Sequence, residues 1–159
     1  MTAGFGAFGK MPSLGDFFRL EVPQSFVDPW DRWLQEAIVA ARAALGARWQ
    51  DSYFSAPIWR FSLAPGLAGP AAAAGIMMMS VDRVGRQFPL TLVQALPEGT
   101  DPLGWHLTAG ALFAALEAVA LDALEDAMTR ERLAALLGAL AVPVASGAEI
   151  RQEAGVLVV

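Results

Sequence analysis

The chain contains no cysteine, so it can form neither a disulfide nor a thiolate metal site. This absence fits a reducing compartment, and we expect a cytoplasmic protein. Basic residues are also scarce, because 11 Lys and Arg stand against 16 Asp and Glu, which gives a net charge of -5. Since phosphate neutralisation dominates the affinity for nucleic acids, an acidic chain without a basic run is not expected to bind them.

Charged residues make up only 17% of the 159 residues, whereas hydrophobic residues make up 55%. This composition excludes disorder and predicts one domain over residues 1–159. The shortage of charge leaves two interpretations open: an apolar contact face on the surface, or an alanine-rich composition that inflates the hydrophobic count. Leu103–Leu121 is long enough to span a bilayer, but it contains Glu117, so we predict a buried core helix and no membrane insertion. Residues 1–10 lack the pattern of a signal peptide.

The first half of the chain combines a strand pattern with a long helical pattern. Small and aromatic residues alternate over Ala3–Met11 and predict a first strand, followed by a loop over Pro12–Val22. Asp28-Pro29 predicts a helix start, with Asp as N-cap and Pro at the first helical position. The helix is expected to end near Gly46. One helical face is apolar and consists of Trp30, Trp33, Leu34, Ala37, Ile38, Ala41 and Leu45. Of these, Trp33, Leu34, Ile38 and Leu45 are predicted to pack on a sheet.

Three apolar segments bounded by proline or by a charged turn are predicted as strands: Ile58–Ala64, Gly75–Val81 and Phe88–Leu96. Their connections are too short for helical crossovers, so they should form an antiparallel meander. Asp101-Pro102 predicts a second long helix, Thr129 caps a third, and Gly155–Val159 predicts a last strand. The order of elements therefore predicts an α/β (α+β) fold. We expect a three-layer α–β–α sandwich with a mostly antiparallel sheet of about four to five strands and helices on both faces.

Residues typical of catalysis occur in patterns that favour structural roles. Gly4–Lys10 matches a phosphate-binding loop in spacing, but Met11 stands where Ser or Thr would bind magnesium, so a glycine-rich strand is favoured. His106 is the only histidine and cannot build a multi-histidine metal site. Asp122, Glu125 and Asp126 are interpreted as a solvated helix face. We therefore expect no enzymatic activity, no metal and no cofactor.

The segment from Ser80 to Leu90 places one aspartate and two arginines in a turn between two apolar strands. Such a turn is either an internally paired ion-pair loop or a presented recognition loop. If the first strand neighbours these strands, the loop after it meets the turn. We therefore predict that a partner-binding site forms at one end of the sheet, from Lys10, Asp16, Asp82, Arg83 and Arg86. Of the two arginines, Arg86 is predicted to be the exposed one.

Five short motifs occur in order: G-x-x-G-K-x-P at 6–12, G-D-F at 15–17, F-V-x-P-W-D-x-W-L at 26–34, P-x-W-R-F at 57–61 and S-V-D-R-V-G-R-x-F-P-L at 80–90. Together they resemble the type VI secretion-associated TagF family, also called ImpM. Two positions depart from the pattern: Met79 replaces an expected proline and Gln87 an expected aromatic residue. From His106 onward, the similarity is one of general character only.

The resemblance implies a cytoplasmic, non-catalytic regulator of a bacterial type VI secretion system. Members of the family are described as post-translational repressors of assembly, acting through a forkhead-associated-domain scaffold protein. Two alternatives stay open at this point, a nucleotide- or phosphate-binding switch and a structural scaffold subunit. The sequence does not indicate an oligomeric state.

Overall fold

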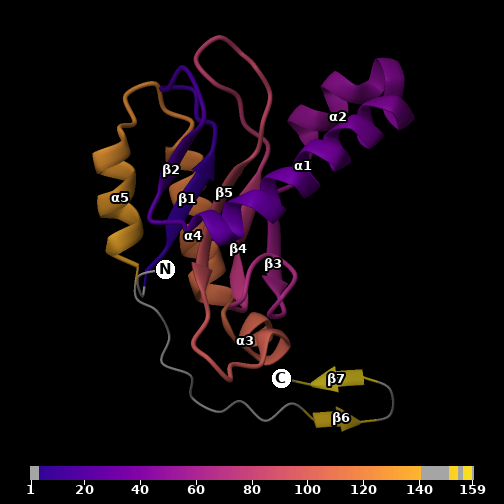
Figure 1. Ribbon diagram of the computed structural model, residues 1–159, viewed down its shortest axis with the longest axis vertical. Coiled ribbons are helices and arrows are strands. Elements are labelled where there is room, and N and C mark those ends of the chain that lie inside the picture. Colours follow the sequence, from indigo (N-terminus) through magenta and orange to yellow (C-terminus); the bar gives the residue numbers. More distant parts are fainter. Residues whose placement is uncertain (1–3, 141–150, 154–155, 159) are drawn as a thin grey trace.

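The computed structural model describes residues 4–140, 151–153 and 156–158. Figure 1 shows its elements. In chain order they are β1 (Gly6–Gly9), β2 (Phe18–Leu20), α1 (Gln24–Leu45), a 3-10 turn (Gly46–Arg48), α2 (Trp49–Ser55), β3 (Trp59–Leu63), β4 (Ala73–Met78), β5 (Leu90–Ala95), α3 (Pro102–Thr108), α4 (Gly110–Asp122), α5 (Arg130–Gly138), β6 (Arg151–Glu153) and β7 (Val156–Val158).

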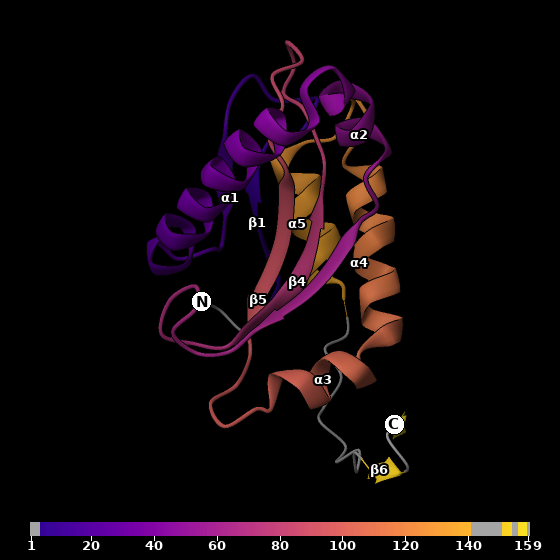
Figure 2. The same cartoon turned by 90° about the vertical axis from the view of Figure 1, so that its right-hand side faces the viewer.

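Five strands form one antiparallel sheet in the order β2-β1-β5-β4-β3. Helix α1 crosses one face of this sheet, and α4 and α5 cover the other (Figures 1 and 2). The predicted α–β–α sandwich is therefore confirmed. The predicted meander is confirmed as well, because β3 pairs with β4 and β4 pairs with β5.

The N-terminal part of the sheet differs from the prediction. The segment Pro12–Val22 contains the short strand β2, which pairs with β1 so that Gly9 lies opposite Phe18. Three residues are too few to show the alternation of apolar and polar side chains by which strands are recognised, so β2 was not predicted. Strand β1 is shorter than Ala3–Met11, and residues 1–3 lie outside the described part of the chain. Because β1 lies between β2 and β5, its C-terminal end lies beside the turn that enters β5.

Helix α1 packs on the sheet through Trp30 and Leu34. The prediction that Trp33 packs there is wrong. The side chain of Trp30 is 6% exposed and that of Trp33 is 51% exposed. Both tryptophans fit the apolar stripe, but the Nε1 of Trp30 donates a buried hydrogen bond of 2.9 Å to the Oγ1 of Thr91 on β5. A buried indole N–H needs such a partner, so the partner on the sheet selects Trp30. Leu34 is buried as predicted, and Ile38 packs partly buried against the same core.

The first turn of α1 lies upstream of the predicted start at Asp28-Pro29. The helix begins at Gln24, with the N–H groups of Phe26 and Val27 both donating to the carbonyl of Pro23. Pro29 consequently lies inside the helix. Pro29 has no N–H to donate to the carbonyl four residues earlier, so the helix continues through this position with one hydrogen bond fewer, and the Asp-Pro pair does not fix the boundary. The helix ends at Leu45, close to the predicted end, and a 3-10 turn leads into α2.

The opposite face of the sheet is covered by α3, α4 and α5. The predicted second long helix is two helices that meet at Ala109 and are bent by 76°. Its predicted N-cap is confirmed, since the Asp101 carboxylate accepts hydrogen bonds from the N–H groups of Leu103 and Gly104. Thr129 caps α5 through the N–H of Arg132, also as predicted. Buried side chains of this face include Ile76, Leu92, Phe113, Leu116 and Leu133.

Among the residues that the structure describes, no single helix is long and apolar enough to cross a membrane. The bent pair of α3 and α4 passes that test by length and composition. The predicted C-terminal strand is observed as β7, which pairs with β6 and not with the central sheet. Residues 155 and 159 of that prediction lie outside the described residues.

Candidate functional site

The turn between β4 and β5 is organised around the carboxylate of Asp82. We call the segment Asp82–Arg86 the arginine turn. The Oδ1 of Asp82 accepts hydrogen bonds from the N–H groups of Val84 (3.1 Å) and Arg86 (2.9 Å). Gly85 has a φ of 85°, a left-handed conformation that glycine adopts without strain. The backbone of the turn is therefore fixed from within by its first side chain.

Two cations approach the second oxygen of the same carboxylate. The Oδ2 of Asp82 lies 3.1 Å from the Nζ of Lys10 and 2.7 Å from the Nε of Arg86. Burial alone would raise the pKa of Asp82, but hydrogen bonds from backbone N–H groups and from Lys10 and Arg86 hold that pKa well below its usual range. Lys10 also lies over the ring of Phe17, with its Nζ 4.7 Å from the centroid. Asp82 is thus a buried, ionised anchor.

Both arginines of the turn hold the loop that joins β1 to β2. A guanidinium nitrogen of Arg83 donates to the carbonyl of Ser13 (2.6 Å), and its backbone N–H donates to the carbonyl of Leu14 (2.8 Å). Arg86 donates through Nη2 to the carbonyl of Gly15 (2.7 Å). Three consecutive carbonyls of this loop are therefore bound by the arginine turn.

The structure brings together the residues that the sequence predicted to converge. Lys10, Asp82, Arg83 and Arg86 contact one another or the same loop. Asp16 lies on that loop, where its carboxylate accepts a hydrogen bond of 2.8 Å from the N–H of Phe17. The side chain of Arg86 is 59% exposed while it pairs with Asp82, so the same residue is both anchored and presented. That these residues bind a partner stays a prediction.

Helix α2 is attached to this cluster by residues that sequence reasoning missed. The hydroxyl of Tyr53 donates to the carbonyl of Ser80 (2.6 Å) and accepts from its N–H (3.2 Å). Burial raises the pKa of Tyr53 to about 12, against lowering contributions from the Ser80 hydrogen bond and from the charge of Arg42. The side chain of Gln87 accepts from the Nε1 of Trp49 (2.8 Å) and from Arg42 (3.3 Å). The sequence marked Gln87 only as a departure from the motif, which has an aromatic residue at this position. An amide at this position makes these two hydrogen bonds possible, since its oxygen accepts from both donors.

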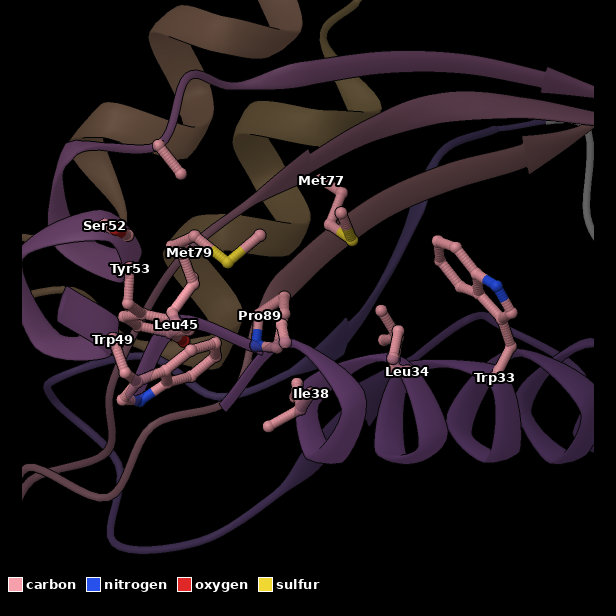
Figure 3. Close-up of a pocket in the computed structure, with 13 residues that line it drawn as sticks. Trp33, Leu34, Ile38, Leu45, Trp49, Ser52, Tyr53, Met77, Met79 and Pro89 are labelled. Atoms are coloured by element: carbon pink, nitrogen blue, oxygen red, sulfur yellow. The ribbon is translucent and has the colours of Figure 1, made fainter. Parts of the chain in front are cut away.

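An apolar groove lies next to the cluster, between the C-terminal half of α1, helix α2 and the end of the sheet (Figure 3). We call it the α1–α2 groove, and its cavity volume is about 190 Å³. Figure 1 shows α2 and the end of α1 extending beyond the sheet. The lining residues are Trp33, Leu34, Ala37, Ile38, Ala41, Leu45, Trp49, Ser52, Tyr53, Ala56, Met77, Met79 and Pro89.

Within the glycine-rich segment Gly4–Lys10, residues Gly6–Gly9 form strand β1. A Cβ on Gly9 would lie 2.0 Å from the carbonyl oxygen of Pro89, and one on Gly6 would lie 2.4 Å from that of Leu20. The glycines therefore permit close approach of neighbouring backbones, as the sequence favoured. The Nζ of Lys10, which would face a phosphate in such a loop, lies on Asp82.

The other polar residues singled out by the sequence lie apart from this cluster. His106, on α3, is half-buried as predicted, with its Nδ1 2.8 Å from the Oγ of Ser62. Burial lowers the pKa of His106, and the charge of Arg60 lowers it further. Glu125 pairs with Arg132 on the surface, at 3.2 Å. Within the described ranges, no three His, Asp or Glu residues are grouped as a metal site would require.

Comparisons with known proteins agree with the motifs. The family model described as "TagF N-terminal domain, Type VI secretion system-associated" matches residues 6–140. The crystal structure of PA0076 from Pseudomonas aeruginosa PAO1 resembles this chain with a TM-score of 0.84 at 37% sequence identity, covering 96% of this chain and 69% of that one. A comparison with curated proteins gives no match. The chain therefore belongs to the family of TagF N-terminal domains, which are associated with type VI secretion systems.

Proposed function

We propose that this chain is a non-catalytic, regulatory protein-binding module of a type VI secretion system. In this proposal it represses assembly of the apparatus by binding a cytoplasmic forkhead-associated-domain scaffold protein. The family membership supports the secretion system as the setting, and the resemblance of the motifs supports the repressor role.

The observation that carries the proposal is the saturation of Asp82 by four donors. Its two oxygens accept from two backbone N–H groups, from Lys10 and from Arg86. A carboxylate that is buried, ionised and fully paired serves poorly as a general acid or base, since it has neither access to substrate nor a suitable pKa. It serves well as the anchor of a rigid surface.

The outer side of the cluster has the features of a recognition surface. Arg86 uses two of the five N–H donors of its guanidinium in its contacts with Asp82 and Gly15. Phe17, on the loop that Arg86 holds, is 45% exposed, and its ring packs edge-on against Phe88. Because the loop and the turn are held by each other, a partner would not have to order them, which favours affinity.

A titration of the purified scaffold into this chain tests the proposal. Arg83→Glu changes the presented surface without removing a partner of Asp82, and Arg32→Glu, on the exposed side of α1, is its charge-matched control. We expect saturable heat with the wild type, binding weakened about tenfold or more by Arg83→Glu, and little change for Arg32→Glu. No binding of wild type to the scaffold would contradict the proposal. Saturable binding of ATP or GTP would favour the nucleotide switch instead.

A further inference from the structure

Strand β3 forms one edge of the five-stranded sheet, with β4 as its neighbour (Figure 1). The N–H of Leu96 donates a hydrogen bond of 2.8 Å to the carbonyl of Ala72, which shows which residues of β4 point toward β5. Because these directions alternate along a strand, the register of β3 with β4 turns the N–H and C=O groups of Arg60 and Ser62 outward. Hydrogen bonds of the described residues reach none of these four groups.

The two edges of the sheet differ in how they are protected. At the other edge, β2 has only three residues, and the carbonyl of Arg19 accepts a hydrogen bond of 3.0 Å from Arg130 of α5. Strand β3 has five residues in unbroken register with β4, and its one charged residue, Arg60, is paired with Glu117 at 2.6 Å. Edge strands usually resist pairing through bulges, prolines or unpaired charges. Strand β3 has none of these within its length and is therefore open to another strand.

The side chains of β3 that face α1 are apolar. Phe61 and Leu63 belong to the core beneath α1, and the rings of Phe61 and Trp30 have centroids 4.7 Å apart. By the alternation of the strand, Trp59 lies on the same face, and it is 53% exposed. Tryptophan is among the residues that contribute most binding energy at interfaces. A strand added at this edge would cover Trp59.

The segment around β3 is symmetric about Phe61. Pro57 precedes Phe61 by four residues and Pro65 follows it by four. If two copies pair antiparallel about a twofold axis at Phe61, the outward groups of Arg60 meet those of Ser62 in the other copy, and all four gain a partner. Pro57 then comes opposite Pro65 of the other copy, so the ladder ends at the same place on both. A second copy therefore matches this edge in length and in hydrogen bonding.

The side chains also fit this register. On the α1 face, Trp59 comes opposite Leu63 of the other copy and Phe61 opposite Phe61, and both are apolar pairs. On the other face, Arg60 comes opposite Ser62. A twofold axis at Arg60 would instead set two guanidinium groups directly opposite each other, which is unfavourable. The charge of Arg60 therefore favours the register centred on Phe61.

We propose that two copies of this chain associate through their β3 edges, antiparallel and with a twofold axis at Phe61, into one continuous sheet. This inference goes beyond the proposed function and uses a different surface. The arginine turn follows β4 and lies toward the end of β3 that begins with Trp59. A dimer of this kind would therefore present two arginine turns at opposite ends of the continuous sheet.

Sedimentation velocity over a range of protein concentrations tests the association. Ser62→Pro removes an outward N–H and leaves the hydrogen bonds between β3 and β4 in place. Ser62→Ala is its matched control, because both variants lose the contact of the Ser62 hydroxyl with His106 but only the proline loses the N–H. We expect wild type and Ser62→Ala to dimerise as concentration rises, and the dissociation constant of Ser62→Pro to be about tenfold higher or more.

Two results of this experiment would overturn the proposal. One is a wild type that stays monomeric at every concentration, which would leave the edge to a strand of another protein. The other is an equal dissociation constant for Ser62→Pro and Ser62→Ala, because the dimer would then not use the outward N–H of β3.

Single cysteines test the register, since the chain has none of its own. In the proposed dimer the two copies of Phe61 form a non-hydrogen-bonded pair with Cα atoms about 4.5 Å apart, within the reach of a disulfide. The two copies of Trp59 are separated by roughly 13 Å along the strands, which is beyond that reach. Under mild oxidation, Phe61→Cys should give a disulfide-linked dimer in non-reducing electrophoresis and Trp59→Cys should not. Equal crosslinking of folded Phe61→Cys and Trp59→Cys, as judged by circular dichroism, would refute the register.

Discussion

The Nζ of Lys10 and the Oδ2 of Asp82 lie 3.1 Å apart, and their side chains are only 7% and 0% exposed. One residue follows β1 and the other begins the arginine turn, so the contact joins two segments that are distant in sequence. Because a buried charge is tolerated only when it is paired, each residue requires the other. This pair fixes the end of the sheet at which three of the five family motifs meet, those at 6–12, 15–17 and 80–90.

Replacing Asp82 by asparagine should destabilise the fold, because it leaves the Lys10 ammonium buried without a counter-charge. Asp16→Asn is the matched control, since Asp16 is exposed in the same cluster and should change the free energy of unfolding by no more than about 0.5 kcal/mol. We expect Asp82→Asn to lower the free energy of unfolding by several times that amount. Urea denaturation followed by tryptophan fluorescence measures both, and equal midpoints for the two variants would contradict the assignment.

Acid should lower the stability of the folded wild type, because it protonates Asp82. An aspartate in an unfolded chain has a pKa of about 3.9, and the pKa of Asp82 in the folded protein is lower. The stabilisation is therefore complete above about pH 4 and is lost as the pH falls toward the folded-state pKa. Urea midpoints measured from neutral pH to about pH 2 should fall more steeply for the wild type than for Asp82→Asn. Parallel profiles would show that Asp82 does not carry this dependence.

Trp30 and Trp33 should respond very differently to truncation. Trp30→Ala removes a buried ring and its hydrogen bond to Thr91, and should cost about 3–5 kcal/mol. Trp33→Ala removes a half-exposed ring at the edge of the groove, and should cost less than about 1 kcal/mol. Thermal unfolding by calorimetry reports both, and a larger effect at Trp33 would reverse the assigned face of α1.

The single tyrosine offers a direct spectroscopic test of how α2 is attached. Burial raises the pKa of Tyr53 to about 12, so tyrosinate absorbance should develop well above the ordinary pKa of about 10. The neutral phenol stabilises the fold below about pH 10, and this contribution is lost as the pH rises toward 12. Tyr53→Phe loses the hydrogen bonds to Ser80 and should cost about 1–2 kcal/mol. A transition near pH 10 in the folded protein would contradict the buried contact.

His106 should titrate below the ordinary histidine value. Burial and the positive charge of Arg60 lower the pKa of His106, so its neutral imidazole is favoured in the folded state. The resulting stabilisation is present above about pH 6.5 and is lost as the pH falls toward the folded-state pKa. Since the chain has one histidine, its imidazole resonances in an NMR pH titration are assigned without mutagenesis. Arg60→Gln should move the midpoint upward, and an unchanged midpoint would exclude the effect of Arg60.

Local signals in the sequence predicted the elements whose structure is decided locally. The side-chain caps at Asp101 and Thr129 and the short connections of the meander each act within a few residues. Strand β2, the bend at Ala109 and the burial of Trp30 depend on partners elsewhere in the fold, such as Thr91 on β5. The apolar stripe of α1 admitted either tryptophan, and only the position of the sheet decides between them.

The charged cluster was predictable because its residues lie at the ends of neighbouring strands. The contacts that anchor it were not, since they run to backbone carbonyls of Ser13 and Gly15, which no side-chain pattern reveals. The α1–α2 groove could not be predicted from the sequence either, because it depends on how far α1 extends past the sheet. The composition indicated that an apolar face was possible but did not locate it.

The place of β1 in the sheet has a consequence for the order of folding. Strand β1 precedes the other strands of this sheet in the chain, yet its partner β5 ends at Ala95, so β1 and its hairpin mate β2 must wait for most of the sheet to be synthesised. Contacts between segments so distant in sequence slow folding. A nascent chain that lacks β5 would leave the edge of β1 opposite β2 unpaired and its apolar side chains exposed, a state open to aggregation and to chaperones. Closure of the sheet around β1 should therefore be the late step, with the salt bridge of Lys10 and Asp82 forming only then.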